Sequence, residues 1–70
     1  MKLNQHNIEV GTLLLNRYQC KIGIVDQVIS FAPYLSVEVL YMGSSISDVV
    51  DQHRLSSGEF EVIPTLEIAP

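Results

Sequence analysis

The sequence predicts an all-β fold, a small and partly open barrel of five strands. Two observations indicate it. Apolar and polar residues alternate in several short segments of the 70-residue chain, as they do in strands that bury one face. Glycine, proline or serine stands between most of these segments, as is typical of turns. The clearest segment is 35–42, where Leu35, Val37, Val39 and Tyr41 share one face, and we expect the other strands to pack against it.

The first three strands are joined by short connections. The first contains three consecutive leucines, Leu13 to Leu15, which cannot all point to one face, so at least one of them faces outward. Gly23 in the second strand indicates a bend, a bulge or the close approach of another backbone. Pro33 marks the turn between the second and third strands, which then form an antiparallel hairpin. The expected strands cover residues 13–16, 21–31, 35–42, 46–53 and 59–63.

The fourth segment, 46–53, leaves an alternative open. Val49 and Val50 lie between acidic residues and favour a short strand. A helix over 47–55 is also consistent with the sequence, because Ser47 could cap its first turn.

The end of the barrel is better defined. The Leu-Ser-Ser-Gly run at 55–58 predicts a single tight turn, of 3₁₀ type, before the last strand. In that strand we expect Phe60 and Val62 to face inward, and Glu59 and Glu61 to face outward.

A single domain accounts for residues 1–70, because no repeat, low-complexity tract or linker divides the chain. Residues 1–7 are expected to form a polar lead-in, 8–63 the barrel and 64–70 a tail. A domain of this size hides only about 60% of the surface of its unfolded chain, so we expect marginal stability.

Composition limits the partners and the compartment. Eight acidic and four basic residues give a net charge of -4, which disfavours generic binding to nucleic acid. Charged residues make up only 17% of the chain, and this favours a homo-oligomer. Cys20 is the single cysteine, and no signal-peptide pattern occurs, so a reducing, cytoplasmic location is expected. The longest wholly apolar run, 13–15, is too short to span a membrane.

Residues suited to catalysis or metal binding follow no established spacing. Cys20 with His6 or His53 could form a nucleophile and base, oriented by Asp48 or Asp51, in a small hydrolase. We instead interpret Cys20 as a small packing residue and the two aspartates as solvated positions. Cysteine and histidine are too few for a zinc site, and the glycines lie too far apart for a phosphate-binding loop. The sequence therefore predicts no enzyme, metal or cofactor.

Aromatic and apolar side chains outside the expected core are the candidates for interaction. Tyr18 and Tyr34 lie in connections, where they can face solvent, and Arg17 beside Tyr18 indicates a mixed aromatic and basic contact site. Leu40 and Met42 interrupt the polar face of the third strand. Together with the outward leucines of the first strand they indicate an apolar surface for a partner.

Two other groups of residues have simpler interpretations. Tyr41 and Phe60 follow the inward alternation of their strands and are expected in the core. Arg17, Lys21 and Arg54 could gather into a basic patch of the kind that binds nucleic acid. Scattered solubilising charge is the interpretation that we prefer.

Three runs of sequence carry a family resemblance. VGTLLLNRYQCKIGIVDQV at 10–28, VEVLYM at 37–42 and LSSGEFEVI at 55–63 resemble the small SH3-like barrels encoded by bacteriophages and common in marine metagenomic sequence. The shared positions serve packing and turns. Thr12 stands where the family has aspartate, and Tyr41 where it has tryptophan. The resemblance implies an SH3-like barrel and transfers no catalytic residue.

These observations predict a non-enzymatic binding or assembly module, related to phage proteins, that self-associates through a strand edge or its outer apolar face. The resemblance places it in the cytoplasm of the host cell or in the virion. A small nucleic-acid-associated regulator is the alternative, and a hydrolase that uses its cysteine is the third hypothesis. The candidate interaction residues are Arg17, Tyr18, Tyr34, Leu40 and Met42.

Overall fold

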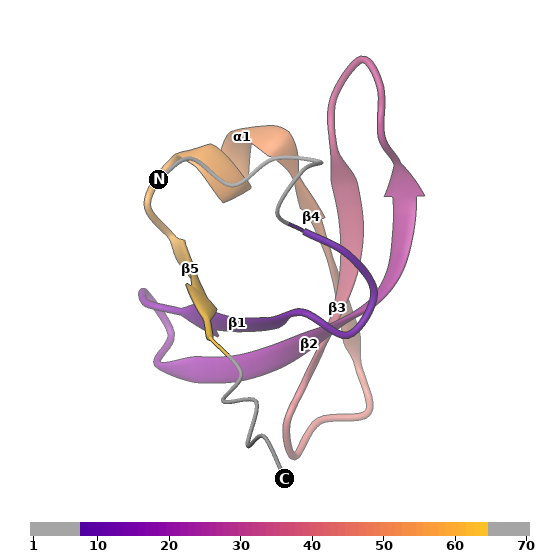
Figure 1. Ribbon diagram of the computed structural model, residues 1–70. Helices are drawn as coiled ribbons and strands as arrows, with labels where there is room; N and C mark the ends of the chain where they lie inside the picture. Colours follow the sequence, from indigo (N-terminus) through magenta and orange to yellow (C-terminus); the bar gives the residue numbers. More distant parts are fainter. Residues whose placement is uncertain (1–7, 65–70) are drawn as a thin grey trace, which may run out of the picture.

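The computed structural model describes residues 8–64 of the protein. Five antiparallel strands form one curved sheet in the order β4-β3-β2-β1-β5, and a short helix, α1, connects the two edge strands (Figure 1). The five expected strands are confirmed, with ends within two residues of the predicted ones. The sheet is not closed, because β4 and β5 do not pair. The elements are β1 Leu13–Asn16, β2 Lys21–Ser30, β3 Ser36–Tyr41, β4 Ser47–Asp51, α1 Gln52–Ser56 and β5 Phe60–Ile63.

The core lies inside the curve of the sheet and follows the predicted alternation. Leu35, Val37, Val39 and Tyr41 are all buried, and so is Phe60. These residues confirm the inward face assigned to the third strand and the core position of the two aromatic side chains. The complete core consists of Ile8, Leu14, Val25, Leu35, Val37, Val39, Tyr41, Val50, Leu55 and Phe60.

Gly23 is required by the packing of β3 against β2. A Cβ atom at this position would lie 2.5 Å from Val39 Cγ1 and 3.0 Å from Tyr41 Cδ1. Of the three possibilities that the glycine indicated, close approach is the one observed. The irregularities of β2 lie further along the strand, where the register with β3 shifts between Val25 and Gln27 and again before Ser30.

The segment after β3 contains both a strand and a helix. β4 ends at Asp51, and α1 begins at the next residue. Ser47 was expected to cap any helix here, and this prediction is wrong. The Asp51 carboxylate is the cap, because its Oδ1 accepts a hydrogen bond from the Arg54 N–H at 2.9 Å.

The predicted 3₁₀ turn over 55–58 is also wrong in type and position. α1 is α-helical and starts three residues earlier. Its start is stabilised by the Asp51 cap, and its position is fixed by Leu55, which is buried in the core.

The predicted lead-in and tail lie outside the described residues, apart from Pro64, which follows β5. Among the residues that the structure describes, no helix is both long and apolar enough to cross a bilayer.

Candidate interaction surfaces

The outward side chains of four neighbouring strands form a continuous apolar surface. In the sheet register, Leu13 lies opposite Ile24, and Leu15 lies opposite Ile22. Ile24 in turn lies opposite Leu40. Because side chains alternate along a strand, all of these point away from the core. The outer apolar face, as we name it, consists of Leu13, Leu15, Ile22, Ile24, Leu40, Met42 and Ile63.

Two further contacts extend this face to its ends. The Met42 N–H donates a hydrogen bond to the Ile22 carbonyl at 2.9 Å, which places Met42 beside Ile22. Ile63 of β5 lies opposite Leu13 on the other side. Ile22, Ile24 and Met42 retain 40%, 38% and 76% of their exposure, so the centre of the face remains open to solvent.

The sequence identified only part of this surface. Leu40 and Met42 were predicted to be outward, and so was at least one leucine of the first strand. The structure places both Leu13 and Leu15 on the outer side and leaves them half-buried. Ile22 and Ile24 were missed, because only the pairing of β2 with both of its neighbours shows that they join the other members.

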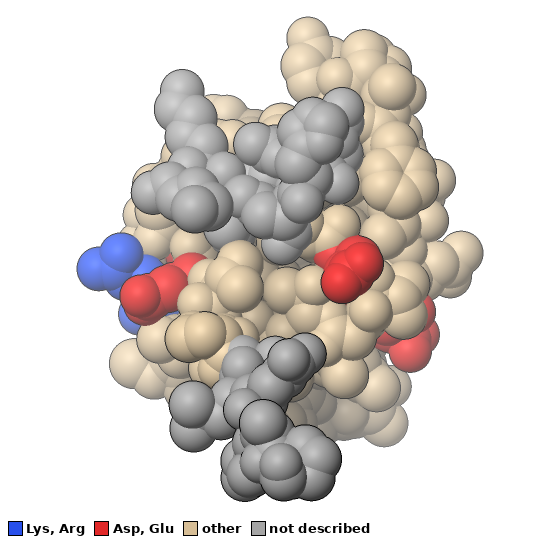
Figure 2. Space-filling model, viewed as in Figure 1, with Lys and Arg blue, Asp and Glu red and all other residues tan. Residues whose placement is uncertain are grey.

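Charge is confined to the margin of the outer apolar face. Glu61 lies opposite Leu15 at the β5 side, and Glu38 lies two residues before Leu40 on the same side of β3. The view in Figure 2 shows isolated acidic spots and basic side chains at one edge, with uncharged surface between them. A partner of this face would therefore meet an apolar centre and an acidic margin.

A network of polar side chains joins the two edge strands, which do not pair with each other. Arg54 of α1 contacts Asp48 of β4 through Nη1 and Oδ1 at 2.9 Å. It also contacts Glu59, the residue before β5, through Nη2 and Oε2 at 2.7 Å. The guanidinium group thus connects the two sides of the open sheet through ion pairs.

The same network continues into the core. The Tyr41 hydroxyl donates to Asp48 Oδ2 at 2.9 Å, and Asn16 Nδ2 donates to the Tyr41 hydroxyl at 3.1 Å. Asn16 Nδ2 also donates to Glu59 Oε2 at 3.1 Å. No buried side-chain nitrogen or oxygen among the described residues lacks a hydrogen-bond partner. The five side chains of this polar network, Asn16, Tyr41, Asp48, Arg54 and Glu59, therefore serve structure.

The electrostatics of the network follow from its contacts. Hydrogen bonds from Arg54 lower the pKa of both Asp48 and Glu59. The two carboxylates in turn raise the pKa of Arg54 above its ordinary value. Burial raises the pKa of Tyr41. The ionised form of the carboxylates is thus the one that the folded protein stabilises.

Three interpretations from the sequence are corrected by this network. Glu59 was expected to face outward, but it is buried beneath Arg54. Asp48 is a half-buried ion-pair partner instead of a solvated residue. Arg54 is engaged by two carboxylates, so a basic patch would have to form from Arg17 and Lys21.

The predicted aromatic and basic contact residues are exposed, and they lie in two separate places. Arg17 and Tyr18 belong to the turn between β1 and β2, whereas Tyr34 lies in the connection between β2 and β3. The two connections follow opposite ends of β2, and the β2–β3 hairpin projects beyond the rest of the molecule (Figure 1). The structure thus keeps Tyr34 apart from the Arg17–Tyr18 pair.

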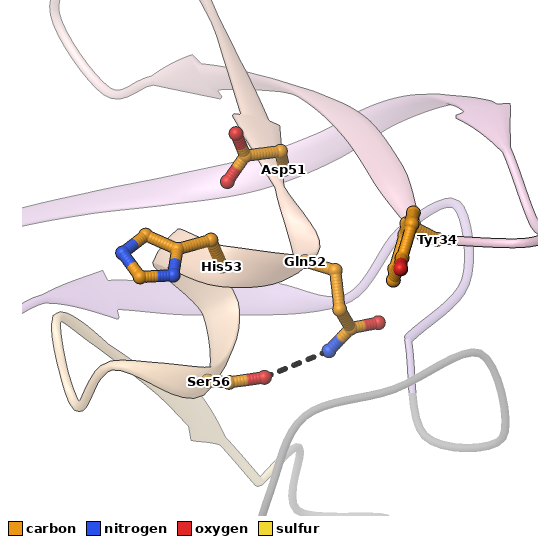
Figure 3. A pocket seen from close by; sticks show the side chains of 5 residues that line it. All are labelled: Tyr34, Asp51, Gln52, His53 and Ser56. Carbon is orange, nitrogen blue, oxygen red and sulfur yellow. Dashed lines mark hydrogen bonds between the residues drawn. The ribbon is translucent and has the colours of Figure 1, made fainter.

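A shallow pocket of about 460 Å³ lies beside Tyr34 and the start of α1, and Asp51, Gln52, His53 and Ser56 complete its lining. Gln52 Nε2 donates to Ser56 Oγ at 2.9 Å. Figure 3 shows Gln52 directed toward Tyr34, while Asp51 and His53 point away from that aromatic ring. Because its polar groups do not converge on one point, the pocket does not form a reaction centre.

Cys20 does not pack in the core as expected. It is exposed and has a φ of 54° at the end of the β1–β2 turn. Asn16 Oδ1 shapes this turn by accepting hydrogen bonds from the Tyr18 and Gln19 N–H groups, at 3.1 Å each. The exposed turn position, rather than packing, accounts for the environment of the cysteine.

The candidate nucleophile and base are not brought together. Cys20 lies in the β1–β2 turn and His53 in α1, and no hydrogen bond joins them within residues 8–64. His6 lies outside the described residues. Over the same part of the chain, no three His, Cys, Asp or Glu side chains are grouped so that they could hold a metal ion.

Comparison of the chain with protein-family models, curated proteins and solved structures found no match. The argument about function therefore depends on the surfaces described above.

Proposed function

We propose that the protein is a non-enzymatic binding or assembly module, built as an SH3-like barrel, that self-associates. Five antiparallel strands in a curved sheet, with one helical turn before the last strand, support the barrel assignment. The observation that carries the function is the outer apolar face, which crosses four of the five strands without an internal charge. Contiguous apolar surface of this kind marks an interaction site in soluble proteins.

The strength of the association can be estimated from the exposed side chains. Fully burying an isoleucine or methionine side chain contributes about 1.5–3 kcal/mol. Ile22, Ile24 and Met42 are only partly exposed, so each contributes roughly half of that, or about 2–5 kcal/mol per copy in total. The loss of translational and rotational freedom opposes this by about 4–15 kcal/mol. The balance corresponds to a weak complex, with a Kd of about 1 μM to 1 mM.

Sedimentation and light scattering test the proposal over this concentration range. The expected result is a weight-average mass that rises from that of the 7.8 kDa chain toward twice that value. A mass that stays at 7.8 kDa up to millimolar concentration refutes self-association.

The phage relationship and the location in host cytoplasm or virion belong to the same proposal and are supported by the sequence resemblance alone. The gene neighbourhood tests them. A place among virion genes supports an assembly role, and a place among early regulatory genes contradicts it.

A further inference from the structure

Self-association could use either an edge of the sheet or its outer face, and the two edge strands are poorly suited to it. Arg54 Nη1 donates to the Val49 carbonyl at 3.3 Å, so a guanidinium group covers the free edge of β4. This strand has only five residues and carries a carboxylate on either side of its valines. Short length and charge are the features by which natural proteins protect edge strands from pairing.

The other edge is equally short. β5 has four residues and is followed by Pro64, which has no N–H to donate to an added strand. Before β5, the Glu59 carbonyl already accepts a hydrogen bond from the Arg17 N–H at 2.7 Å. Neither edge therefore offers a long row of free backbone groups.

The outer apolar face has the opposite character. Its members form two rows, with Leu15, Ile22 and Met42 in one and Leu13, Ile24, Leu40 and Ile63 in the other. Strand spacing gives this area a width of roughly 20 Å and a height of roughly 10 Å, or about 200 Å² in projection. A standard stable interface covers about 800 Å² on each partner. The face thus has the size of the apolar centre of a weak dimer, whose remainder is a polar rim.

We propose that a second copy of this chain packs face to face on the outer apolar face, sheet against sheet. The inference rests on the proposed self-association and specifies its geometry. A copy is the occupant that fits the charge pattern, because two neutral faces of equal size meet without burying a charge, and one two-fold contact covers both. Glu38 and Glu61 lie at the margin, so two copies of an acidic chain repel each other there. Salt screens this repulsion and is expected to strengthen the dimer.

Matched substitutions test the geometry by sedimentation equilibrium. Met42 and Tyr34 are exposed to nearly the same extent, 76% and 71%, on the face and on the projecting hairpin respectively. Met42→Glu is expected to weaken dimerisation by about tenfold or more, because it places a carboxylate in the apolar centre. Tyr34→Glu adds the same charge elsewhere and is expected to leave the Kd within about twofold.

A third variant tests the β4 edge directly. The Val49 carbonyl points to the free edge, and the N–H of the same residue points the same way in an antiparallel ladder. Val49→Pro therefore removes an edge donor while it leaves the pairing with β3 intact. Face-to-face packing predicts an unchanged Kd for this variant.

The outcomes separate the two proposals. An unaffected Met42→Glu dimer, an equal loss in Tyr34→Glu, or a dimer abolished by Val49→Pro overturns the face-to-face geometry and leaves self-association standing. A monomeric wild-type protein overturns self-association itself. NMR spectra of the wild-type protein on dilution give a readout that needs no variant, with concentration-dependent shifts expected in β1, β2 and β3 and absent from β4. Shifts centred on β4 contradict the inference.

Discussion

Replacement of Arg54 by methionine is expected to destabilise the protein more than the removal of any exposed charge. The substitution keeps an unbranched apolar stem, but it removes both ion pairs that connect Asp48 to Glu59 across the open side of the sheet. It leaves two carboxylates facing each other, and one of them is buried. The network would retain the hydrogen bonds from Asn16 and Tyr41, which do not supply a positive charge.

The magnitude follows from the exposure of the three side chains. Arg54 and Asp48 retain 31% and 28% of their side-chain exposure, so this pair resembles a surface ion pair and contributes about 0.5–1 kcal/mol. The Glu59 side chain is only 11% exposed, and leaving its carboxylate without a counter-charge costs about 1–3 kcal/mol. The expected loss is about 2–4 kcal/mol. A chain of 70 residues has a free energy of unfolding of about 4–10 kcal/mol, so the variant would lose a large part of it.

Urea unfolding at neutral pH measures the loss, with Arg17→Met as the matched control. Arg17 is exposed and takes part in neither ion pair, so its replacement is expected to change the free energy of unfolding by less than about 0.5 kcal/mol. Equal effects of the two substitutions would refute a structural role for the network.

The pH dependence gives an independent check on the same reasoning. The pKa values of Asp48 and Glu59 are lowered in the folded state. Their contribution to stability is therefore present above their ordinary pKa, about 4, and is lost as the pH falls through the lowered values. Without Arg54 this contribution is missing at every pH, so the difference between wild type and variant is expected to shrink toward pH 2–3. A difference that stays constant from pH 7 to pH 2 contradicts the assignment.

Three other predictions follow from single contacts. Gly23→Ala is expected to cost about 1–3 kcal/mol in urea unfolding, because its Cβ would lie 2.5 Å from Val39 Cγ1; an unchanged midpoint would refute the close approach. Tyr41→Phe removes the hydroxyl that accepts from Asn16, with an expected loss of about 1–2 kcal/mol, and thermal unfolding that matches wild type would show that the hydroxyl contributes nothing. Cys20 is exposed and is expected to react with a neutral thiol reagent within a few fold of the rate in the unfolded protein; a reaction limited by unfolding would contradict its position.

Short-range pattern was enough to predict the strands and their inner face. The alternation at 35–42 depends only on the two-residue period of a strand, so Leu35, Val37, Val39 and Tyr41 could be assigned to the core before any strand was paired. The same reasoning identified Leu40 and Met42 as outward. It also placed Tyr18 and Tyr34 in exposed connections, because turns lie at the surface.

Local pattern failed where two tendencies met in one segment. The strand and helix signals after residue 46 both proved correct, in succession, because the Asp51 side chain is free to cap a helix only once β4 has ended there. The type and start of α1 depend on that cap and on the burial of Leu55 against strands distant in sequence. Neither can be read from propensity alone.

By itself, then, the sequence determined the class of fold, the number and order of the strands along the chain, and the residues that face inward, because these follow from local periodicity. Only the tertiary structure decided which outward side chains meet, since the outer apolar face exists through the register of four strands. It also decided the fate of Glu59, whose alternation predicted solvent. Arg54 and Asn16, five and 43 residues away in sequence, bring it into the polar network, because ion pairs and hydrogen bonds depend on distance in space.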